Sequence, residues 1–427
     1  MIRKIFMPEG GGELKKTYLW TVLAGLLYAG SSFLMSMAVS NILGARQAGI
    51  FAIAMTVGNQ LVTIGYYNMR TFQASDVTEK YSFADYCGFR AVTVTVMAAA
   101  GIVWIAAGGY EREKAIAVGW MTLFKIFEAV SDLLEGRYQQ KGRYDVSCRG
   151  VFVKTALYLI CFVAVLLLTG NLQVSLAFMG IVYGVCILII DGSLIPYFGG
   201  IRIRFYAAAQ KSLLISCMPL FINSFFMTYI VNAAKYSMER YYSDDYLGIF
   251  NALYMMAFVV NLFSSFVFKP LIEPLSVKFN GGDLKGFTAV VKRQALIIVC
   301  ITAVCVTGAY FLGIPVLTWL FGINLDGYRS ALCVILAGGA FTALYQLLQY
   351  GIVIMRHQAG CLAGCMVTAV LTFLFTPLLV RRFAVFGGAV SYFCSMALMS
   401  AVLLIFFLYD LKVEKKAAQE EAEYEKE

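Results

Sequence analysis

Apolar and polar positions follow one another along this chain in long blocks, with apolar runs of about 20 residues separated by short polar segments. A helix of about 20 residues crosses the roughly 30 Å of hydrocarbon in a bilayer. The runs are continuous and lack the two-residue alternation of barrel strands, so we expect helices, whose backbone hydrogen bonds are satisfied internally. The pattern predicts twelve membrane-spanning helices, at residues 17–40, 47–69, 89–109, 115–133, 150–169, 174–196, 212–234, 247–271, 294–320, 330–355, 359–380 and 384–409.

The composition supports an all-α polytopic membrane protein. Hydrophobic residues make up 60% of the 427 residues and charged residues 14%, whereas soluble domains have roughly 45–50% apolar and about 25% charged residues. The basic N-terminal segment has no signal-peptide cleavage pattern, so we expect it to stay cytoplasmic. These features predict a multi-pass protein of the cell inner (cytoplasmic) membrane.

The positions of Lys and Arg predict the orientation of the chain. They concentrate in alternate connecting segments, including residues 135–149 and 200–211, and excess basic residues mark the cytoplasmic side. Both termini are then cytoplasmic. The longest external loop is expected at residues 235–246, where Lys235 and Arg240 lie beside two aspartates and predict a solvated, salt-bridged loop.

One apolar stretch occurs twice. Residues 48–70 and 247–269 both begin near a Gly-Ile-Phe triplet and both end on a cation, Arg70 in the first copy and Lys269 in the second. A match at a fixed offset indicates an internal duplication. With six spans per copy, both halves have the same membrane orientation, a plan in which the transport pathway lies between the repeats.

The duplication predicts two pseudo-symmetric six-helix lobes around a central cavity. The predicted parts are the N-terminal lobe 1–199, the cytoplasmic linker 200–211, the C-terminal lobe 212–409 and the charged cytoplasmic tail 410–427.

The fourth predicted span carries charges where lipid is expected. Lys125, Glu128 and Asp132, with Glu135 just beyond, share one helix face. Each ionised group near mid-membrane costs about 2.5–3.5 kcal/mol on insertion scales, so this face needs ion pairs or a hydrated cavity. Two interpretations stay open: a self-neutralising Lys125–Glu128 pair with the other two carboxylates near the cytoplasmic surface, or a stripe that lines a cavity.

The second predicted span also has a polar face, formed by Asn59, Thr63, Tyr66 and Arg70. In the eighth span the corresponding face keeps Tyr254 and Lys269 but is interrupted by Phe258 and Leu262. Cations at the inner end of a span also follow from topology alone, so Arg70 and Lys269 have a topological as well as a functional interpretation. The continuous face favours spans two and four of the first lobe as the part that binds a charged ligand.

Two further charged residues lie within or near apolar spans. Lys154 follows the start of the fifth span, from where its side chain either reaches the membrane surface or lines a cavity. Asp191 is the only carboxylate of the sixth span and precedes Pro196, near the expected interface.

The sequence offers few residues for a metal site or for catalysis by histidine. His357 is the single histidine, and most of the 11 cysteines lie inside apolar spans, which is typical of buried free thiols. The sequence contains no phosphate-binding loop and no nucleophile motif. We expect no cofactor, no metal, no nucleic-acid partner and no enzyme activity.

Residues 41–54, 135–144 and 268–276 resemble the polysaccharide-flippase branch of the multidrug/oligosaccharidyl-lipid/polysaccharide (MOP) exporter superfamily. The matching residues are Leu43, Gly44, Gly49, Ile50 and Phe51 at the second span, Gly136 and Gln139 after the fourth, and Pro274, Leu275 and Ser276 after the eighth. The sequence departs from the family pattern at Arg46 and Gln47, where many members have a Pro-acidic pair. Its single histidine leaves carboxylates to carry any proton coupling.

The resemblance implies a repeat-unit flippase. Members of that family move undecaprenyl-diphosphate-linked oligosaccharides from the inner to the outer leaflet through a cavity that opens alternately to each side. An ion gradient, of H⁺ or Na⁺, or the membrane potential is the implied driving force. The implied partners are the lipid-linked oligosaccharide, membrane lipid, and a glycan polymerase or glycosyltransferases.

A diphosphate with a hydrophilic glycan cannot cross hydrocarbon unaided, so such a lumen needs cations and polar or aromatic groups. The candidate substrate-binding residues are Arg70, Lys125, Lys154 and Lys269 for the diphosphate, with Asn59, Tyr66 and Tyr254. The candidate ion-coupling residues are Glu128, Asp132 and Asp191.

Other functions stay open at this point. A multidrug or organic-cation antiporter of the same superfamily would need a lumen dominated by carboxylates, whereas the candidate cations here outnumber the candidate carboxylates. A lipid II flippase typically has more spans than are predicted here. A membrane-embedded glycan polymerase or acyltransferase is disfavoured by the short external loops and the lone His357.

Overall fold

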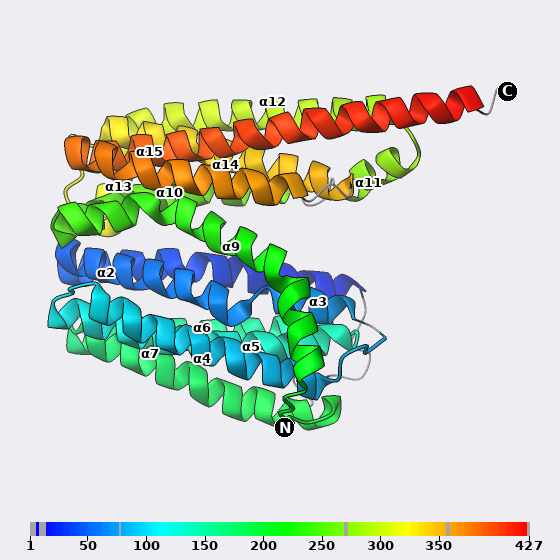
Figure 1. Ribbon diagram of the computed structural model, residues 1–427. Helices are drawn as coiled ribbons and strands as arrows, with labels where there is room; N and C mark the ends of the chain where they lie inside the picture. The colour runs from blue at the N-terminus through cyan, green and yellow to red at the C-terminus, as the bar shows by residue number, and fades with distance from the viewer. Residues whose placement is uncertain (1–5, 8–13, 77, 269–271, 356–358, 425–427) are drawn as a thin grey trace. The chain divides into compact units, whose positions relative to one another are not determined.

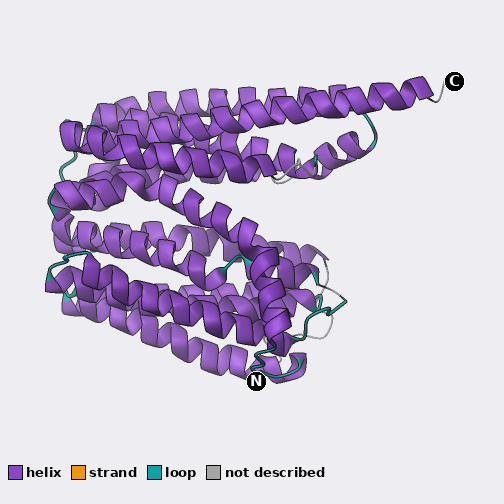
Figure 2. Ribbon diagram, viewed as in Figure 1, coloured by secondary structure: helices purple, strands orange, loops and turns teal. Residues whose placement is uncertain are grey.

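The structure of the chain, a computed structural model, describes residues 6–7, 14–76, 78–268, 272–355 and 359–424 (Figure 1). The side chains of residues 14–16, 258–268, 272–274, 359 and 417–424 lie outside this description. Within the described ranges the chain is helical and contains no strand, as Figure 2 shows. The predicted all-helical fold is confirmed.

The helices follow one another with short connections. The first half contains α2 (Leu14–Tyr66), α3 (Met69–Ser75), α4 (Phe83–Ala107), α5 (Arg112–Gln140), α6 (Tyr144–Thr169), α7 (Leu172–Cys186), the π-helix η1 (Ile187–Asp191), α8 (Gly192–Leu194), the 3-10 helix η2 (Ile195–Phe198) and α9 (Ala207–Tyr241). The second half contains α10 (Asp244–Phe268), α11 (Ile272–Asn280), α12 (Leu284–Gly308), the π-helix η4 (Ala309–Gly313), α13 (Ile314–Phe321), α14 (Arg329–Ile354) and α15 (Ala359–Tyr424).

Eight helical stretches within the described residues are long and apolar enough to cross a membrane. The chain is therefore a multi-pass membrane protein. Two of the long helices have a residue outside the helical conformation, Gly44 in α2 (φ 83°) and Ala384 in α15 (φ 48°). Both interruptions lie where the sequence places a boundary between two spans. The total of twelve crossings, the pseudo-symmetry and the cytoplasmic termini stay predictions.

The two halves of α15 pack against each other in antiparallel register. The Oγ1 of Thr376 lies 2.6 Å from the Oγ of Ser391, and Thr372 donates to Ser395 at 3.1 Å. Near the turn, a Cβ on Gly387 would lie only 2.0 Å from the carbonyl oxygen of Leu379. A glycine is therefore needed where the chain folds back.

The chain forms two compact units, Met1–Phe225 and Phe226–Glu427. In the first unit, α2 packs on α5 and α6, α4 packs on α5, and α6 packs on α7. In the second unit, α14 packs against α15, α10 and α12. The boundary between the units lies inside α9, and the predicted division at 1–199, 200–211, 212–409 and 410–427 stays a prediction.

The prediction that the second span continues to residue 69 is wrong. α2 ends at Tyr66, because Tyr67 and Asn68 both adopt left-handed backbone conformations (φ 46° and 52°) before α3 begins. Asn68 donates to the carbonyl oxygen of Leu220 at 3.3 Å and to Ser224 at 2.9 Å, which stabilises this break. Arg70 therefore lies on α3 and not on the α2 face predicted to carry it.

The prediction of a solvated loop at residues 235–246 is also wrong. α9 continues to Tyr241 and α10 begins at Asp244, so the connection is much shorter than expected. Lys235 lies inside α9 and is only 5% exposed. Its Nζ atom lies 4.5 Å from the centroid of the Tyr254 ring, at a distance typical of a cation–π contact.

Candidate functional site

One face of α5 is the centre of a buried set of ion pairs in the first unit. The set, called the α5 network below, consists of Asp132 and Glu135 on α5, Arg70 on α3, Arg90 on α4, Lys154 on α6 and Asp191 at the end of η1. The α5 residues share a face because the helix repeats every 3.6 residues. Buried charges need such partners, because an uncompensated ion inside a protein costs several kcal/mol.

Arg70 joins α3 to α5. Its Nη1 atom lies 2.9 Å from Glu135 Oε2 and 3.3 Å from Asp132 Oδ1, and its Nη2 atom donates to Ser147 at 3.0 Å. The Arg70 side chain is 28% exposed, the most of any cation in the network. It is thus the network cation that a ligand reaches first.

Arg90 joins α4 to Asp132, one of the two carboxylates that Arg70 also contacts. Its Nη2 atom lies 2.8 Å from Asp132 Oδ2, and its Nη1 atom donates to the carbonyl oxygen of Gly65 in α2. Its guanidinium carbon lies 6.0 Å from the centroid of the Tyr66 ring. Asp132 is therefore shared between two arginines.

Arg90 is not among the site residues predicted from the sequence, in which it is the second residue of the predicted third span, at the edge of the apolar run. α4 in fact begins at Phe83, where Ser82 and Asp85 cap the helix through reciprocal side-chain and backbone hydrogen bonds. Such a Ser-x-x-acid pattern before an apolar run predicts a helix start. This signal moves the start of the helix back to residue 83 and places Arg90 well inside it instead of at its end. Glu135 is not among the predicted site residues, because the predicted fourth span ends at residue 133, whereas α5 continues to Gln140.

Lys154 is fully buried and joins three elements. Its Nζ atom lies 2.9 Å from Glu135 Oε1 and 3.1 Å from Asp191 Oδ2, and it donates to the hydroxyl of Ser131. The Tyr138 hydroxyl also donates to Asp191, at 3.1 Å. The Lys154 side chain reaches neither the membrane surface nor the wall of a cavity in this structure. It lies between helices, where Glu135 and Asp191 compensate its charge.

Lys125 and Glu128 form the ion pair that the sequence suggested. The Lys125 Nζ atom lies 2.6 Å from Glu128 Oε2, the Tyr28 hydroxyl donates to the same carboxylate, and both charged side chains are buried. Lys125 therefore packs between helices, contrary to the expectation of a cavity-lining stripe. Asp132 and Glu135 form ion pairs with the cations of the α5 network.

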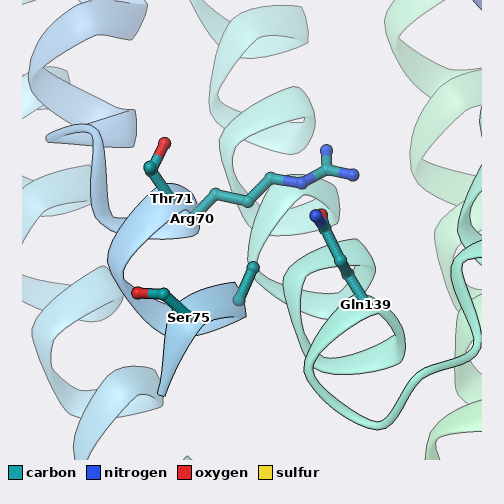
Figure 3. Close-up of a pocket in the computed structure, with 5 residues that line it drawn as sticks. Arg70, Thr71, Ser75 and Gln139 are labelled. Carbon is teal, nitrogen blue, oxygen red and sulfur yellow. The ribbon is translucent and has the colours of Figure 1, made fainter. Parts of the chain in front are cut away.

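A cavity of about 390 Å³ opens beside Arg70. Figure 3 shows Arg70, Thr71 and Ser75 on one helix and Gln139 on the facing helix, and Ala74 completes the lining. A guanidinium, two hydroxyls and a carboxamide supply several hydrogen-bond donors. This cavity is the accessible edge of the α5 network.

The Gly-x-x-Gln motif of the sequence lies at this cavity. A Cβ on Gly136 would lie 2.6 Å from Gln73 Oε1 and 3.4 Å from Arg70 Cγ, so α3 packs closely on α5 because residue 136 has no side chain. Gln139, three residues later, lines the cavity itself. Gly136 of this motif therefore has a structural role in this chain, because it lets α3, which carries Arg70, pack closely on α5.

A second group of ion pairs holds the connection between α3 and α4. Arg137 Nη1 lies 3.1 Å from Glu79 Oε1, Lys141 pairs with the same carboxylate, and Arg137 Nε donates to the carbonyl oxygen of Phe198 at 3.0 Å. The hydrogen bond from Lys141, together with Arg137, lowers the pKa of Glu79 below its ordinary value. Glu79 is therefore an ionised anchor near neutral pH.

The other predicted site residues make no ion pair in the α5 network or lie outside the described residues, although Tyr66 lies beside Arg90. Asn59 and Tyr66 are half-buried on α2. Tyr254 lies in the second unit, beside Lys235 and 5.1 Å from the Tyr392 ring centroid. Lys269 lies outside the described residues, as do the side chains of Phe258 and Leu262.

The candidate coupling carboxylates are all in ion pairs. Within the part of the chain that the structure describes, no group of three His, Cys, Asp or Glu side chains could hold a metal ion. The three candidate coupling carboxylates, Glu128, Asp132 and Asp191, each have a Lys or Arg partner. A ligand or proton that binds here must compete with those partners.

Comparison with curated proteins gives a weak but nearly full-length relationship. No protein-family model matches the chain. The chain is 20% identical over 404 residues to the capsular polysaccharide biosynthesis protein CapF of Staphylococcus aureus, a match that covers 93% of this chain and 99% of CapF.

Solved structures with the same fold are transporters. A multidrug resistance MATE family transporter of the MOP superfamily, in its inward-facing conformation, has a TM-score of 0.71 at 11% identity, over 91% of this chain and 96% of that one. The lipid II flippase MurJ, in an inward closed conformation, has a TM-score of 0.70 at 11% identity, over 93% and 91%. A MOP superfamily transporter from Pyrococcus furiosus has a TM-score of 0.61 at 11% identity, over 96% and 98%.

The chain therefore has the fold of MOP superfamily transporters, and the resemblance noted from the sequence is confirmed. The similar structures are of transporters, in agreement with the expectation that the chain is not an enzyme.

Proposed function

We propose that this protein moves an undecaprenyl-diphosphate-linked oligosaccharide from the inner to the outer leaflet of the cytoplasmic membrane by alternating access. The MOP fold, which the lipid II flippase MurJ shares, supports a lipid-linked substrate. The similarity to CapF, named for capsular polysaccharide biosynthesis, supports a glycan headgroup. A glycan polymerase or glycosyltransferases would then supply or consume the same lipid-linked unit.

The cavity beside Arg70 is the observation that carries this proposal. Phosphate oxygens bind best to charged, forked donors such as guanidinium, with hydroxyl and amide donors around them. Arg70, Thr71, Ser75 and Gln139 provide that combination around about 390 Å³. One water occupies roughly 30 Å³, so the space accommodates a diphosphate.

Arg70 also supplies a means of coupling. Its guanidinium is held by Asp132 and Glu135, so an incoming phosphate competes with these carboxylates for the same donors. Protonation of Asp132 or Glu135 removes that competition and frees Arg70 for the substrate. Protonation of these two carboxylates and binding of the substrate at Arg70 are in this way linked.

The remaining site residues have secondary roles in the proposal. Lys125 and Lys154 become available to the diphosphate only when their ion pairs open, and Lys269 would add a cation in the C-terminal lobe. Glu128 and Asp191 are then the carboxylates released at those openings. Asn59, Tyr66 and Tyr254 would contact sugar rings.

Export of surface glycan in cells tests the proposal. Arg70→Gln should reduce export at least about tenfold, because a hydrogen bond to a charged group contributes roughly 1.5–3 kcal/mol. Thr71→Val and Gln139→Ala leave every ion pair of the network intact and should reduce export as well. Arg46→Gln removes a half-exposed arginine that pairs with Glu111 and Glu113 outside the network, and is the matched control. Normal export by Arg70→Gln at a normal level in the membrane contradicts the proposal.

A multidrug antiporter is the second candidate. It is favoured by the fold shared with a MATE multidrug transporter and by two carboxylates, Asp132 and Glu135, that lie beside the same cavity. Deletion of the gene distinguishes the two functions. Drug sensitivity with intact surface glycan supports the antiporter, and loss of glycan with unchanged drug sensitivity supports the flippase.

A further inference from the structure

The segment between η2 and α9 has an unusual pattern of exposed side chains. Residues 201–206 read Ile-Arg-Ile-Arg-Phe-Tyr, form no helix or strand, and are all exposed. Gly199 and Gly200 precede it with positive φ angles of 109° and 70°, which let the chain turn sharply out of η2. Apolar and basic residues therefore alternate along a surface segment at the end of the helices.

This segment has a fixed position on α4. The backbone N–H of Arg204 donates to the carbonyl oxygen of Ala84 at 3.0 Å, and the Gln210 side chain donates to that of Asp85 at 3.0 Å. A Cβ on Gly88 would lie 2.1 Å from the Arg204 carbonyl oxygen, so the segment rests directly on the α4 backbone. These contacts hold the backbone of the segment in a defined position on α4.

An apolar pocket of about 180 Å³ lies under the segment. Ile201 and Ile203 form its rim, and Cys87, Arg90, Ala91, Val94, Val130, Leu133 and Leu134 complete its lining. The Arg90 guanidinium is already paired with Asp132, so the free wall is hydrocarbon. A pocket of this kind favours an apolar chain over water.

The two basic residues of the segment lie next to the pocket-lining isoleucines in the sequence. Ile201 and Ile203 line the pocket, whereas Arg202 and Arg204 do not. The Arg204 side chain is 60% exposed and lies 3.8 Å from Asp85 Oδ1 at its closest. Arg204 also lies 5.3 Å from the centroid of the Tyr206 ring, so its contacts are a long ion pair and an exposed aromatic face. Both arginines are exposed and alternate along the segment with the two isoleucines that line the apolar pocket.

We propose that residues 201–206 and α4 bind one anionic phospholipid of the surrounding membrane, with an acyl chain in the pocket and the phosphate on Arg202 and Arg204. The chemistry requires an occupant with a hydrocarbon chain joined to a negative charge. A nucleic acid or an acidic peptide supplies the charge but not the chain, and a zwitterionic lipid supplies the chain with no net charge. Anionic lipid also concentrates basic segments at membrane surfaces, by about 1 kcal/mol per residue.

Native mass spectrometry of the purified full chain in detergent tests the site, with dioleoyl phosphatidylglycerol and dioleoyl phosphatidylcholine as probes. We expect the wild type to retain phosphatidylglycerol about thirtyfold better, as two contacts of about 1 kcal/mol each predict. Arg202→Gln/Arg204→Gln should abolish this preference, and Ala91→Phe, which fills the pocket, should reduce retention of both lipids. The matched control is Lys292→Gln/Arg293→Gln, which removes two exposed cations of α12 and should leave the preference unchanged.

The arginine double variant decides the test, because both side chains are exposed and the one ion pair lost, Arg204 with Asp85, is long and lies at the surface. An unchanged preference in that variant overturns the proposal. Stronger retention of undecaprenyl phosphate than of phosphatidylglycerol, lost in the same variant, also overturns it and assigns the pocket to an isoprenoid lipid. The proposal is independent of the transported substrate, so export need not change in any of these variants.

Discussion

The ammonium of Lys154 lies 3.1 Å from the carboxylate of Asp191, and the two side chains are 0% and 1% exposed. Asp191 ends the π-helix η1, where the extra residue per turn shifts the side chains that follow. The pair therefore ties the end of the sixth predicted span to α6 through a charge contact that water does not reach. Such contacts are geometrically specific even where their net contribution to stability is small.

Lys154→Met should destabilise the protein by about 3–5 kcal/mol, because it leaves Glu135 and Asp191 without their shared cation. Unfolding of the purified protein in detergent, followed by circular dichroism, measures the loss. The double variant Lys154→Met/Asp191→Asn should be more stable than the single one, since it removes one orphaned charge. Equal stability of wild type and Lys154→Met would mean that the pair is not formed.

Exchange of the Lys125–Glu128 pair tests whether the two residues only neutralise each other. Lys125→Glu alone places two carboxylates together and should lower stability by about 3–5 kcal/mol. Lys125→Glu/Glu128→Lys should recover more than half of that loss, because the Tyr28 hydroxyl can accept from an ammonium as well as donate to a carboxylate. Full stability without export in the double variant would show that the order of the charges matters for transport.

Gly136→Ala should weaken the contact between α3 and α5. The new methyl group would lie 2.6 Å from Gln73 Oε1, and the buried Gln73 has no route to solvent, so we expect a loss of about 1–3 kcal/mol and lower export. Gly119→Ala is the control on the same helix, because its Cβ meets nothing closer than 3.9 Å. That variant should be neutral or up to about 1 kcal/mol more stable, from helix propensity alone. A stable, active Gly136→Ala protein argues against close packing at the motif.

The Glu79 ion pairs predict a small pH dependence. Because the folded-state pKa of Glu79 is lowered, its pairs with Lys141 and Arg137 stabilise the fold above the ordinary glutamate pKa of about 4.3. That contribution is lost as the pH falls through the lowered pKa. The side chain is one-third exposed, so the effect should stay below about 1 kcal/mol. The difference in melting temperature between wild type and Glu79→Gln should be present at pH 6 and vanish in strong acid; a difference that persists there contradicts this assignment.

The charged face of α5 could be predicted because helical periodicity alone places Lys125, Glu128 and Asp132 together. The position of Arg70 could not, because Gly65 near the end of α2 is still helical and the two residues that break the helix, Tyr67 and Asn68, are neither glycine nor proline. Among residues other than glycine, asparagine is one of the types that adopt the left-handed conformation most readily, so Asn68 is a reasonable place for a break. Tyrosine is not such a type, so Tyr67 gives no signal in the sequence. The partners of the α5 face come from helices distant in sequence, and only packing identifies them.

Lys235 shows a second limit of sequence-based interpretation. Its neighbours along the chain are polar and charged, a composition typical of a loop, yet α9 extends through them. The nearby Tyr254 ring gives the ammonium an electrostatic partner inside the second unit. A charge count along the sequence does not detect an aromatic partner from another helix.

The α5 network has an electrical consequence. Its three cations and three carboxylates sum to no formal charge. A membrane potential does work only on net charge that moves, about 2.3 kcal/mol per elementary charge per 100 mV. The empty network can therefore change position with little electrical work, whereas one bound proton or one bound diphosphate makes the same movement sensitive to voltage, with opposite sign.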